Sequence, residues 1–386
     1  LYSSAASDVY KRQILTASPM VHEYCEDASD RSCTLVSTSH SDAFEFVLGR
    51  APRIQGRGYC GSPVEIGGRE LAAAVRNETL SEPILTVVVP VFNNGRFLLS
   101  KCLPSLKRNK CWSRLKVLLV DDGSTDATTC DTCQELSNLY DNIDFFTFGD
   151  GGSGSASRPR NKGIEMSDTE LVSFLDPDNE ISPGGYDFLL NEFFEANAGD
   201  SVCDFVSGYQ VKVGETTKIT GKHASGRSKQ IADPVNTFFN AGKFPVVSTQ
   251  AAVIRRRMLV ENEIAFVEGA AGQDTLYGWQ VLASAKNPIF VDQAFLTYYA
   301  ERDDSVTNAV SASYFEKSLR LEEVQVPVLK SLGVFEIYRD GQFRNFFKNW
   351  YLKKLELVPE QEKQSSAAFL EKIAELYKID ASSLRL

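Results

Sequence analysis

The clearest pattern along the chain begins at residue 84: short apolar runs alternate with polar segments that have helical spacing. Continuous apolar runs of this length are typical of strands buried on both faces of a parallel sheet. The expected strands are 84–89, 115–120, 143–148 and 171–175, with helices at 96–107, in a segment ending near 139, and at 160–166. This alternation predicts an α/β fold with a doubly wound, mostly parallel sheet.

Beyond residue 180 the pattern is less regular. We expect helices at 186–197 and 273–285, and strands within 202–213, 250–255 and 288–291. From residue 313 onwards we expect a helical C-terminal region, broken at Pro327, Gly333 and Pro359. The main domain then spans 83–308, and the helical region spans 309–386.

The residues before the main domain give weaker signals. Residues 1–13 resemble translated sequencing-adaptor read-through, so we exclude them from fold reasoning. Residues 14–82 mix short β-like pieces with glycine-rich turns, and we assign them no function.

Composition and charge narrow the class of protein. The chain has 386 residues, 43% hydrophobic and 24% charged, which is the profile of a soluble globular protein with one large or two ordinary domains. Its apolar runs are far shorter than the roughly 18 residues that a membrane-spanning helix needs. A net charge of −10 argues against a nucleic-acid partner, because such proteins bind phosphates through Lys and Arg. The three histidines stand alone, which argues against a His-rich metal site and a Ser-His-Asp triad.

Two of the eight cysteines, Cys130 and Cys133, have the spacing of a zinc knuckle, and Cys102 and Cys111 are candidates for the other ligands. The alternative is that all four are reduced thiols, with one of the pair facing the core from a helix. We favour this alternative, because the pair falls within an expected helix.

Polar clusters follow each of the four expected strands, where ligands bind in sheets of this kind. The first strand leads into Pro90-Val91-Phe92-Asn93, and the second leads into Asp121-Asp122-Gly123-Ser124-Thr125-Asp126. The third is followed by a Gly/Ser loop, 149–157, and by Arg158-Pro159-Arg160-Asn161-Lys162-Gly163. The fourth ends at Asp176-Pro177-Asp178. Two carboxylates one residue apart can hold Mg²⁺ or Mn²⁺, although an isolated acidic turn of this kind is also common by chance.

In this order and at this spacing, the four motifs resemble those of the family 2 glycosyltransferases, which have the GT-A fold. The resemblance covers about residues 84–308. It implies an inverting, metal-dependent transferase with a nucleotide sugar as donor, a UDP-sugar being expected. The implied acceptor is a hydroxyl of a glycan, of a teichoic-acid-like polymer or of a lipid-linked molecule.

The resemblance also implies roles for residues of the donor site. Phe92 would stack on the donor base, a contact worth about 1–3 kcal/mol. Asp122 would accept a hydrogen bond from uracil, assisted by Asp121 or Asp126. The other residues assigned to donor binding on this basis are Pro90, Asn93, Arg160, Asn161, Asp176 and Arg302.

Carboxylates carry the implied chemistry. Asp178 would ligate the metal directly, and Asp176 would contact the ribose or the metal. Asp274 matches the family's general base, although the Glu that usually precedes it is Gln273 here, which removes one influence on the pKa of the base. In the implied single displacement Asp274 takes the proton of the acceptor, and Arg302 offsets the charge of the departing UDP.

Each motif also has a purely structural alternative. Phe92 could be a core residue, and the Gly/Ser loop could be a slack linker. Residues 121–126 could cap a helix through Ser124 or Thr125, with Asp126 meeting the helix dipole. Asp274 could be an ordinary first-turn helix residue, and Arg302 could pair with a neighbouring surface aspartate.

The C-terminal region adds two predictions. Segment 343–354 is aromatic and basic within an acidic chain, so it is either an interfacial helix on an anionic membrane or a helix packed on the main domain. We favour the packed helix. Residues 360–386 suit an amphipathic helix that could support a homo-oligomer. The expected location is the cytoplasm, with any membrane contact at the inner face of the plasma membrane.

Two other functions remain open. A non-catalytic, glycosyltransferase-like subunit that binds nucleotide or glycan is compatible with the neutral Gln273, whereas Asp176, Asp178 and Asp274 favour an enzyme. A nucleotidyltransferase is less favoured, because it would carry a glycine-rich phosphate loop with a lysine after the first strand. This chain has Phe92-Asn93-Asn94-Gly95-Arg96 there.

Overall fold

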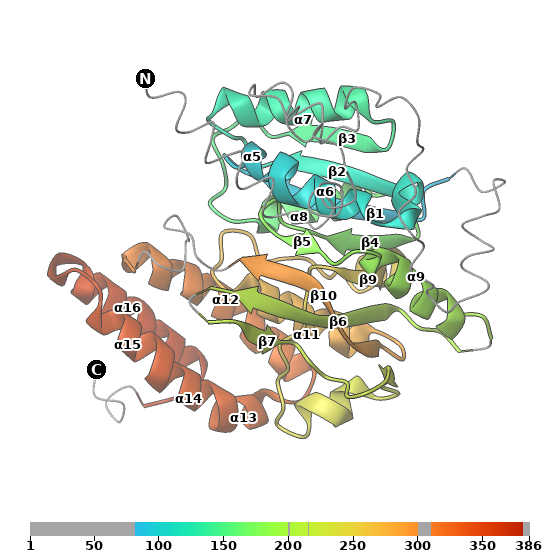
Figure 1. Cartoon of the computed structure of the whole chain (residues 1–386). Helices are drawn as coiled ribbons and strands as arrows, with labels where there is room; N and C mark the ends of the chain where they lie inside the picture. The colour runs from blue at the N-terminus through green and yellow to red at the C-terminus, as the bar shows by residue number, and fades with distance from the viewer. Residues whose placement is uncertain (1–81, 200, 215, 300–309, 381–386) are drawn as a thin grey trace, which may run out of the picture.

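The computed structural model describes residues 82–199, 201–214, 216–299 and 310–380 (Figure 1). The expectations for residues 1–13, for 14–81 and for Arg302 lie outside these residues. The description therefore begins at the last residue of the weakly patterned segment and covers almost all of the predicted main domain.

A ten-stranded sheet runs through the middle of the molecule (Figure 1). Its strands lie side by side in the order β3 (Ile143–Thr147), β2 (Leu115–Asp121), β1 (Leu85–Val91), β4 (Leu171–Phe174), β9 (Ala252–Arg255), β6 (Phe205–Val213), β10 (Ile289–Tyr299) and β5 (Glu180–Ile181). Two short strands extend it, since β7 (Lys218–Thr220) pairs with β6 and β8 (Lys229–Gln230) pairs with β10.

The long ladders of the sheet are parallel, as predicted. β3, β2, β1 and β4 are parallel neighbours, and β6 is parallel to β10, whereas β9 is antiparallel to both β4 and β6. β10 continues eight residues beyond the predicted end at 291. The apolar run stops at Asp292, but the strand keeps its pairing with β6 through two register irregularities.

Helices cover both faces of the sheet, which confirms the α/β class. One face packs against the helical segment α5–η2–α6 (Gly95–Phe97, Leu98–Cys102, Leu103–Lys107), α7 (Ala127–Leu139) and α9 (Gly185–Ala196). The other packs against α8 (Ser157–Met166), α10 (Arg256–Glu261), α11 (Gln273–Ser284) and the C-terminal helices. β1 shows why: Val87 and Val89 enter the first core and Val88 enters the second, so the strand is apolar on both faces.

The helical C-terminal region is present, with one correction to its predicted breaks. Its elements are α12 (Ala312–Ser331), α13 (Phe335–Tyr338), η5 (Arg339–Phe343), α14 (Arg344–Phe346), η6 (Phe347–Tyr351), α15 (Leu352–Glu356) and α16 (Glu360–Leu376). Breaks occur at Gly333 and Pro359, but the predicted break at Pro327 is wrong, because α12 continues through it. Pro327 and Glu323 are both exposed, so water can bond the carbonyl that the proline leaves without an N–H.

Segment 343–354 packs on the rest of the molecule. Phe343, Phe347 and Tyr351 are buried, and the indole N–H of Trp350 donates to the Tyr314 hydroxyl at 2.8 Å. These contacts support the packed alternative, while Phe346 stays partly exposed on the outer side. Membrane contact by this segment stays a prediction. In the part of the chain that the structure describes, no helix is both long and apolar enough to cross a membrane.

The contacts of the cysteines agree with the thiol interpretation. Cys133 is buried in α7 and Cys130 is only partly exposed on the same helix. Burial raises the pKa of the Cys133 thiol, and likewise those of Cys102 and Cys111. A zinc site needs thiolates, so these surroundings oppose one. Among the described residues no three or more His, Cys, Asp or Glu side chains are grouped so as to hold a metal.

Candidate active site

The parallel strands β2, β1 and β4 end at the same edge of the sheet, and the loops that follow them build the candidate site. Asp121, the last residue of β2, is fully buried. Its carboxylate accepts hydrogen bonds from the Ser124 N–H at 3.0 Å and from the Thr147 hydroxyl at 2.7 Å. It therefore holds the turn after β2 against the end of β3, and its assistance in uracil binding stays a prediction.

Asp126, rather than Ser124 or Thr125, is the N-cap of α7. Its carboxylate accepts a hydrogen bond from the N–H of Thr129 at 2.7 Å. A cap must directly precede the first helical residue, and Asp126 holds that position. Ser124 and Thr125 instead bond to Asn93, which ties the end of β1 to the turn after β2.

Asp122 lies at the centre of a network that fastens the Gly/Ser loop. Its side chain is almost fully buried, and one carboxylate oxygen accepts hydrogen bonds from both the N–H and the hydroxyl of Ser153, each at 2.7 Å. The other oxygen accepts from Nε of Arg158 at 2.7 Å. Arg158 also pairs with Asp150, and its hydrogen bonds lower the pKa of Asp150 to about 2. The loop is thus a fixed part of the site and not a slack linker.

Phe92 lies at the surface and not in the core, since 40% of the residue is exposed. Its ring packs on Gly152 so closely that a Cβ at this glycine would lie 2.6 Å from the ring. Gly152 also has a φ of +97°, which side chains rarely adopt. Glycine is therefore required here for two reasons. Pro90, in contrast, is buried within β1 opposite Val120, so its contact with a donor stays a prediction.

Arg160 joins two carboxylates that are far apart in the sequence. One terminal nitrogen donates to Asp176 at 2.7 Å, and the other donates to Asp274 at 2.6 Å. The Arg160 side chain is 3% exposed, whereas that of Asp274, at the start of α11, is 53% exposed. Burial lowers the pKa of Arg160, but the two carboxylates raise it by more, so the guanidinium stays charged. Asp274 is thereby held at the rim of the site with part of its carboxylate open to solvent.

Gln250 fixes the turn that carries the paired aspartates. Its amide N–H group donates to Asp176 at 2.8 Å, and its carbonyl oxygen accepts from the Asp176 N–H at 2.9 Å and from Asn179 at 3.0 Å. Both oxygens of Asp176 therefore have partners, one in Arg160 and one in Gln250. Asp178 is buried within the same turn.

Asn161 positions the loop that leads to Asp274. Its side chain donates to the Phe266 carbonyl at 2.9 Å and accepts from the Phe266 N–H at 2.8 Å. The loop then rests on α12, where the Ala271 N–H donates to the Lys317 carbonyl at 3.3 Å and the Arg320 guanidinium packs on Gly269. Asn161 is thus engaged with protein, and its contact with a donor stays a prediction.

The structure brings most of the predicted residues together and adds three that the sequence reasoning missed. Arg158 lies within a motif singled out from the sequence, but only Arg160 and Asn161 were given roles there. Ser153 lies in a loop that was considered only for its small side chains. Gln250 had no signal, because an isolated glutamine before a strand resembles any other. Arg302 lies outside the described residues.

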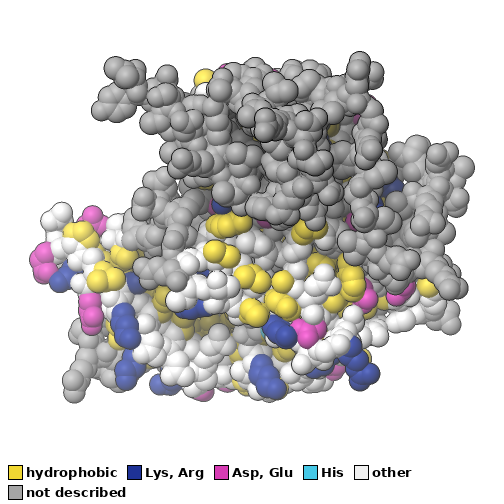
Figure 2. All heavy atoms as spheres, in the orientation of Figure 1, with side chains coloured by type: hydrophobic (Ala, Val, Ile, Leu, Met, Phe, Trp, Pro, Cys, Tyr) yellow, Lys and Arg dark blue, Asp and Glu magenta, His cyan; other side chains and the backbone are white. Residues whose placement is uncertain are grey.

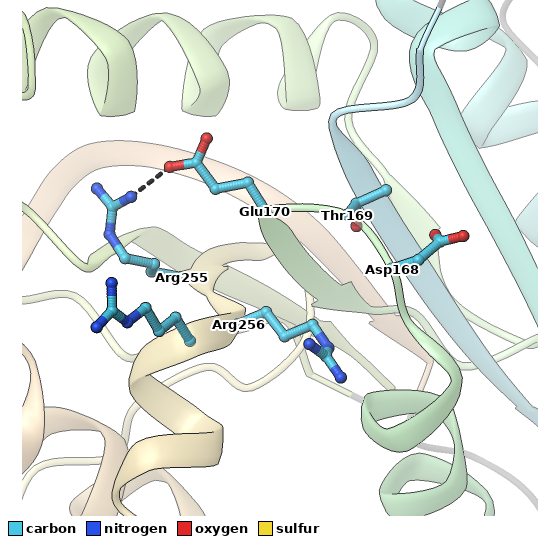
Figure 3. A pocket seen from close by; sticks show the side chains of 6 residues that line it. Asp168, Thr169, Glu170, Arg255 and Arg256 are labelled. Carbon is cyan, nitrogen blue, oxygen red and sulfur yellow. Dashed lines mark hydrogen bonds and ion pairs between the residues drawn. The ribbon is translucent and has the colours of Figure 1, made fainter.

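A separate cavity of about 410 Å³ opens at the opposite end of β4. Figure 3 shows Glu170 and Arg255, which form an ion pair there, beside Asp168, Thr169 and Arg256. These residues precede β4, end β9 or directly follow β9, whereas Asp176 follows β4 at its other end. The cavity is therefore not part of the candidate active site.

The sequence matches known proteins over the part that builds this site. The sequence model described as Glycosyl transferase family 2 matches residues 86–261. YibD of Escherichia coli, an uncharacterized glycosyltransferase, is 25% identical over 56% of this chain and 61% of its own length. The match thus spans about six tenths of that protein. A GalNAc(5)-diNAcBac-PP-undecaprenol beta-1,3-glucosyltransferase of Campylobacter jejuni is 29% identical over 60% of this chain and 70% of its own.

Two staphylococcal proteins complete the comparison. The poly(ribitol-phosphate) beta-N-acetylglucosaminyltransferase TarP of Staphylococcus aureus is 23% identical over 70% of this chain and 79% of its own. The crystal structure of S. aureus TarS 1–349 in complex with UDP-GlcNAc aligns with a TM-score of 0.56 and 18% identity, covering 76% of this chain and 90% of that one. The two chains share one fold, which confirms the predicted architecture. The matched region, residues 86–261, contains the ends of β1, β2 and β4 and is a glycosyl transferase family 2 region.

Proposed function

We propose that this protein is an inverting glycosyltransferase that moves a sugar from a UDP-sugar to a hydroxyl group of an acceptor. The observation that carries the proposal is the bridge that Arg160 makes between Asp176 and Asp274, the second of which lies 114 residues after Arg160. Through this one guanidinium, the turn expected to hold the donor diphosphate and the expected base become neighbours. That arrangement is what a displacement between two bound substrates requires.

The nucleotide end of the site supports a uridine donor. Phe92 offers an exposed ring beside the Gly/Ser loop, which suits stacking on a base. Asp122 is held by Arg158 and Ser153 so that it presents a charged acceptor, and the N3–H of uracil is a matching donor. The similarity to the TarS complex with UDP-GlcNAc adds to this support.

The residues also fit Mn²⁺ or Mg²⁺. Carboxylate oxygens are the ligands that hard cations prefer, and Asp176 and Asp178 supply them at the end of β4. We assign the direct ligand to Asp178, which is buried in the turn after β4, with Asp176 beside it held by Arg160 and Gln250. Such a site would be completed by phosphate oxygens of the donor, and the cation would neutralise charge on the leaving diphosphate.

The proposed reaction is a single displacement in which Asp274 acts as the base. The part of the Asp274 carboxylate that faces solvent would take the proton from the acceptor hydroxyl as its oxygen attacks the anomeric carbon. The bond from that carbon to the UDP oxygen breaks in the same step, so the anomeric configuration inverts. Arg160 holds the Asp274 carboxylate in place through its hydrogen bond, so the base is oriented before the acceptor arrives. A role for Arg302 in UDP departure stays a prediction.

A hydroxyl on a glycan, a teichoic-acid-like polymer or a lipid-linked molecule is the acceptor that the relatives favour. TarP acts on poly(ribitol-phosphate) by its name, and the Campylobacter enzyme acts on an undecaprenol-linked glycan by its name. The second candidate function, a non-catalytic binding subunit, is less favoured because Asp274 is partly open to solvent beside the Asp176–Asp178 turn.

The substitution Asp274→Asn tests the proposal. We expect transfer to fall by about 10²–10⁴-fold, because the base is lost, while the affinity for UDP measured by calorimetry stays unchanged. Asp168→Asn at the far end of β4 is the matched control and should transfer normally. Normal turnover by Asp274→Asn would refute the base, and failure of the unmodified protein to bind any nucleotide sugar would favour the binding subunit.

A further inference from the structure

A row of side chains crosses three strands beside the candidate active site. In the register of the sheet, Tyr298 of β10 pairs with Lys212 of β6, and Lys212 pairs with Lys218 of β7. Directly paired residues on neighbouring strands point to the same face, so the three side chains form one line, which we call the cross-strand row. The Lys212 ammonium lies 5.6 Å from the centre of the Tyr298 ring, as that line requires.

The cross-strand row begins at the catalytic carboxylates. The N–H of Tyr299 donates to the side-chain oxygen of Asn179, the residue after Asp178, at 3.3 Å. Tyr298 therefore lies next to the turn of paired aspartates. Burial raises the pKa of Tyr298, and the charges of Asp176 and Asp274 raise it further, which agrees with this position. From Tyr298 the row leads away across two strand spacings, or about 10 Å.

Among the residues that the structure describes, no carboxylate lies in the cross-strand row or in the preceding line on the same face. Lys212 and Lys218 are both exposed. The preceding line on the same face consists of Leu296, Gln210 and Thr220, which carry no charge. Figure 2 shows separate Lys and Arg side chains on the lower part of this view, with hydrophobic and some acidic side chains between them. In a chain of net charge −10, such a row attracts anions.

We propose that the cross-strand row is an acceptor subsite for a polyanionic chain whose charges are phosphodiesters. The inference rests on the proposed function, because Asp274 as base fixes where the acceptor hydroxyl lies. An acceptor that reaches Asp274 and passes over Tyr298 brings its next units onto Lys212 and Lys218. The tyrosine ring offers a flat apolar surface for the carbon skeleton, and the ammonium groups are point charges that suit phosphate.

Magnitudes indicate how strongly the row can act. An exposed ion pair contributes about 0.2–1 kcal/mol and is screened by salt. Two such pairs change affinity by about 2–30-fold, so the row would tune acceptor binding without affecting the donor. Replacing both lysines by glutamate turns attraction into repulsion, and the effect should lie at the upper end of this range.

The test is the double variant Lys212→Glu/Lys218→Glu in the full chain. Its matched control is Lys330→Glu/Lys372→Glu, which makes the same charge change on α12 and α16. Binding of a fluorescent glycerol-phosphate oligomer is followed by anisotropy, together with its uncharged methyl phosphotriester and an oligogalacturonate. The unmodified protein should bind the phosphodiester more tightly than the other two, and raising salt from about 50 to about 300 mM should weaken that binding.

We expect the row variant to lose about tenfold or more in affinity for the phosphodiester oligomer, with unchanged UDP affinity and an unaffected control variant. Equal binding by the row variant and the unmodified protein would overturn the proposal. Tighter binding of oligogalacturonate than of the phosphodiester oligomer would overturn the assignment of the acceptor charges to phosphodiesters. If row-dependent binding is found without any transfer activity, the proposed function fails and the anionic subsite stands.

Discussion

At the scale of single residues, Arg158 fixes the carboxylate of Asp122, the side chain that we expect to contact the nucleotide. It donates to the buried Asp122 carboxylate and to Asp150, and it stacks on the Phe148 ring at 4.1 Å. Without Arg158, the Asp122 carboxylate would lose the hydrogen bond and the cation that fix its orientation. We therefore propose Arg158 as a positioning residue for the nucleotide.

We predict that Arg158→Ala weakens UDP binding by about tenfold or more, since hydrogen bonds to a charged group contribute about 1.5–3 kcal/mol. Calorimetric titration with UDP measures the effect. Arg158→Lys keeps the positive charge but loses the forked guanidinium geometry. Its affinity for UDP should therefore lie between those of the unmodified protein and Arg158→Ala. Unchanged or tighter UDP binding by Arg158→Ala would contradict this role and would mean that Arg158 obstructs the nucleotide site in the unmodified protein.

The sequence predicts site residues well where their type is tied to a strand end, and poorly where their role depends on a distant partner. Asp122, Asp176 and Asp274 stand in motifs, and the structure brings the second and third of them together. Gln250 contributes through Asp176, 74 residues away, and no local pattern indicates that contact. For the same reason, the alternative that Ser124 or Thr125 caps α7 is wrong, since both residues contact the distant Asn93 and the Asp126 carboxylate is the cap.

At the scale of elements, the close contact between α8 and β1 positions Arg160. Gly163 lies directly over Val88, and a Cβ at this glycine would clash with both methyl groups of the valine. α8 carries Arg160 three residues earlier, less than one turn away. The distance between α8 and β1 therefore determines how far the Arg160 guanidinium lies from the sheet.

We predict that Gly163→Ala destabilises the protein by about 1–3 kcal/mol through overpacking and also lowers transfer, because Arg160 is displaced. Urea unfolding measures the first effect. Val88→Ala in the same chain should restore part of the stability by making room. Gly199→Ala is the control, since nothing lies within 4 Å of a Cβ there. A fully stable Gly163→Ala would contradict the tight contact.

Most long strands and helices of the main domain can be predicted from the sequence, because their apolar residues recur at the positions that face the neighbouring elements. The short elements β5, β7, β8 and α10 were not predicted. Two further departures, the length of β10 and the passage of α12 through Pro327 in the C-terminal region, have a tertiary cause. β10 is extended by pairing with β6 after its apolar run ends, and α12 tolerates Pro327 on an exposed side. Pairing partners and solvent exposure are not visible in a local pattern.

At the scale of the whole molecule, a buried polar network holds the C-terminal helices together. The Glu322 carboxylate on α12 accepts hydrogen bonds from Tyr351 at 2.8 Å, from Tyr377 at 2.7 Å and from Gln325 at 2.8 Å. Burial raises the pKa of Glu322 from 4.5 to about 7, although the tyrosine hydrogen bonds act in the opposite direction. The folded protein therefore favours the protonated acid.

This shift predicts how stability depends on pH. Below about pH 4.5 Glu322 is protonated in both the folded and the unfolded chain, and its contribution is complete. As the pH rises to about 7 the unfolded chain gives up the proton first, so stability falls by about 3 kcal/mol and then levels off.

Urea unfolding of the unmodified protein and of Glu322→Gln between pH 5 and 8 tests this prediction. The variant lacks the titrating group, so the stability difference between the two should move in favour of the variant as the pH rises. Glu323→Gln, at the exposed neighbouring position, is the control and should leave the pH profile unchanged. Parallel curves for Glu322→Gln and the unmodified protein would contradict a raised pKa.

The contact between the loop before Asp274 and α12 has a consequence for cleavage of the chain between the main domain and the C-terminal helices. Ala271 and Gly269 touch Lys317 and Arg320, and one hydrophobic cluster includes side chains from α11 and from α12 to α16. Removal of the helices after β10 would expose that cluster to solvent. The loop before Asp274, the proposed base, would then lose its contact with α12. Limited proteolysis near residue 310 should therefore yield two fragments that stay associated, and separating them should abolish catalysis without preventing nucleotide from binding.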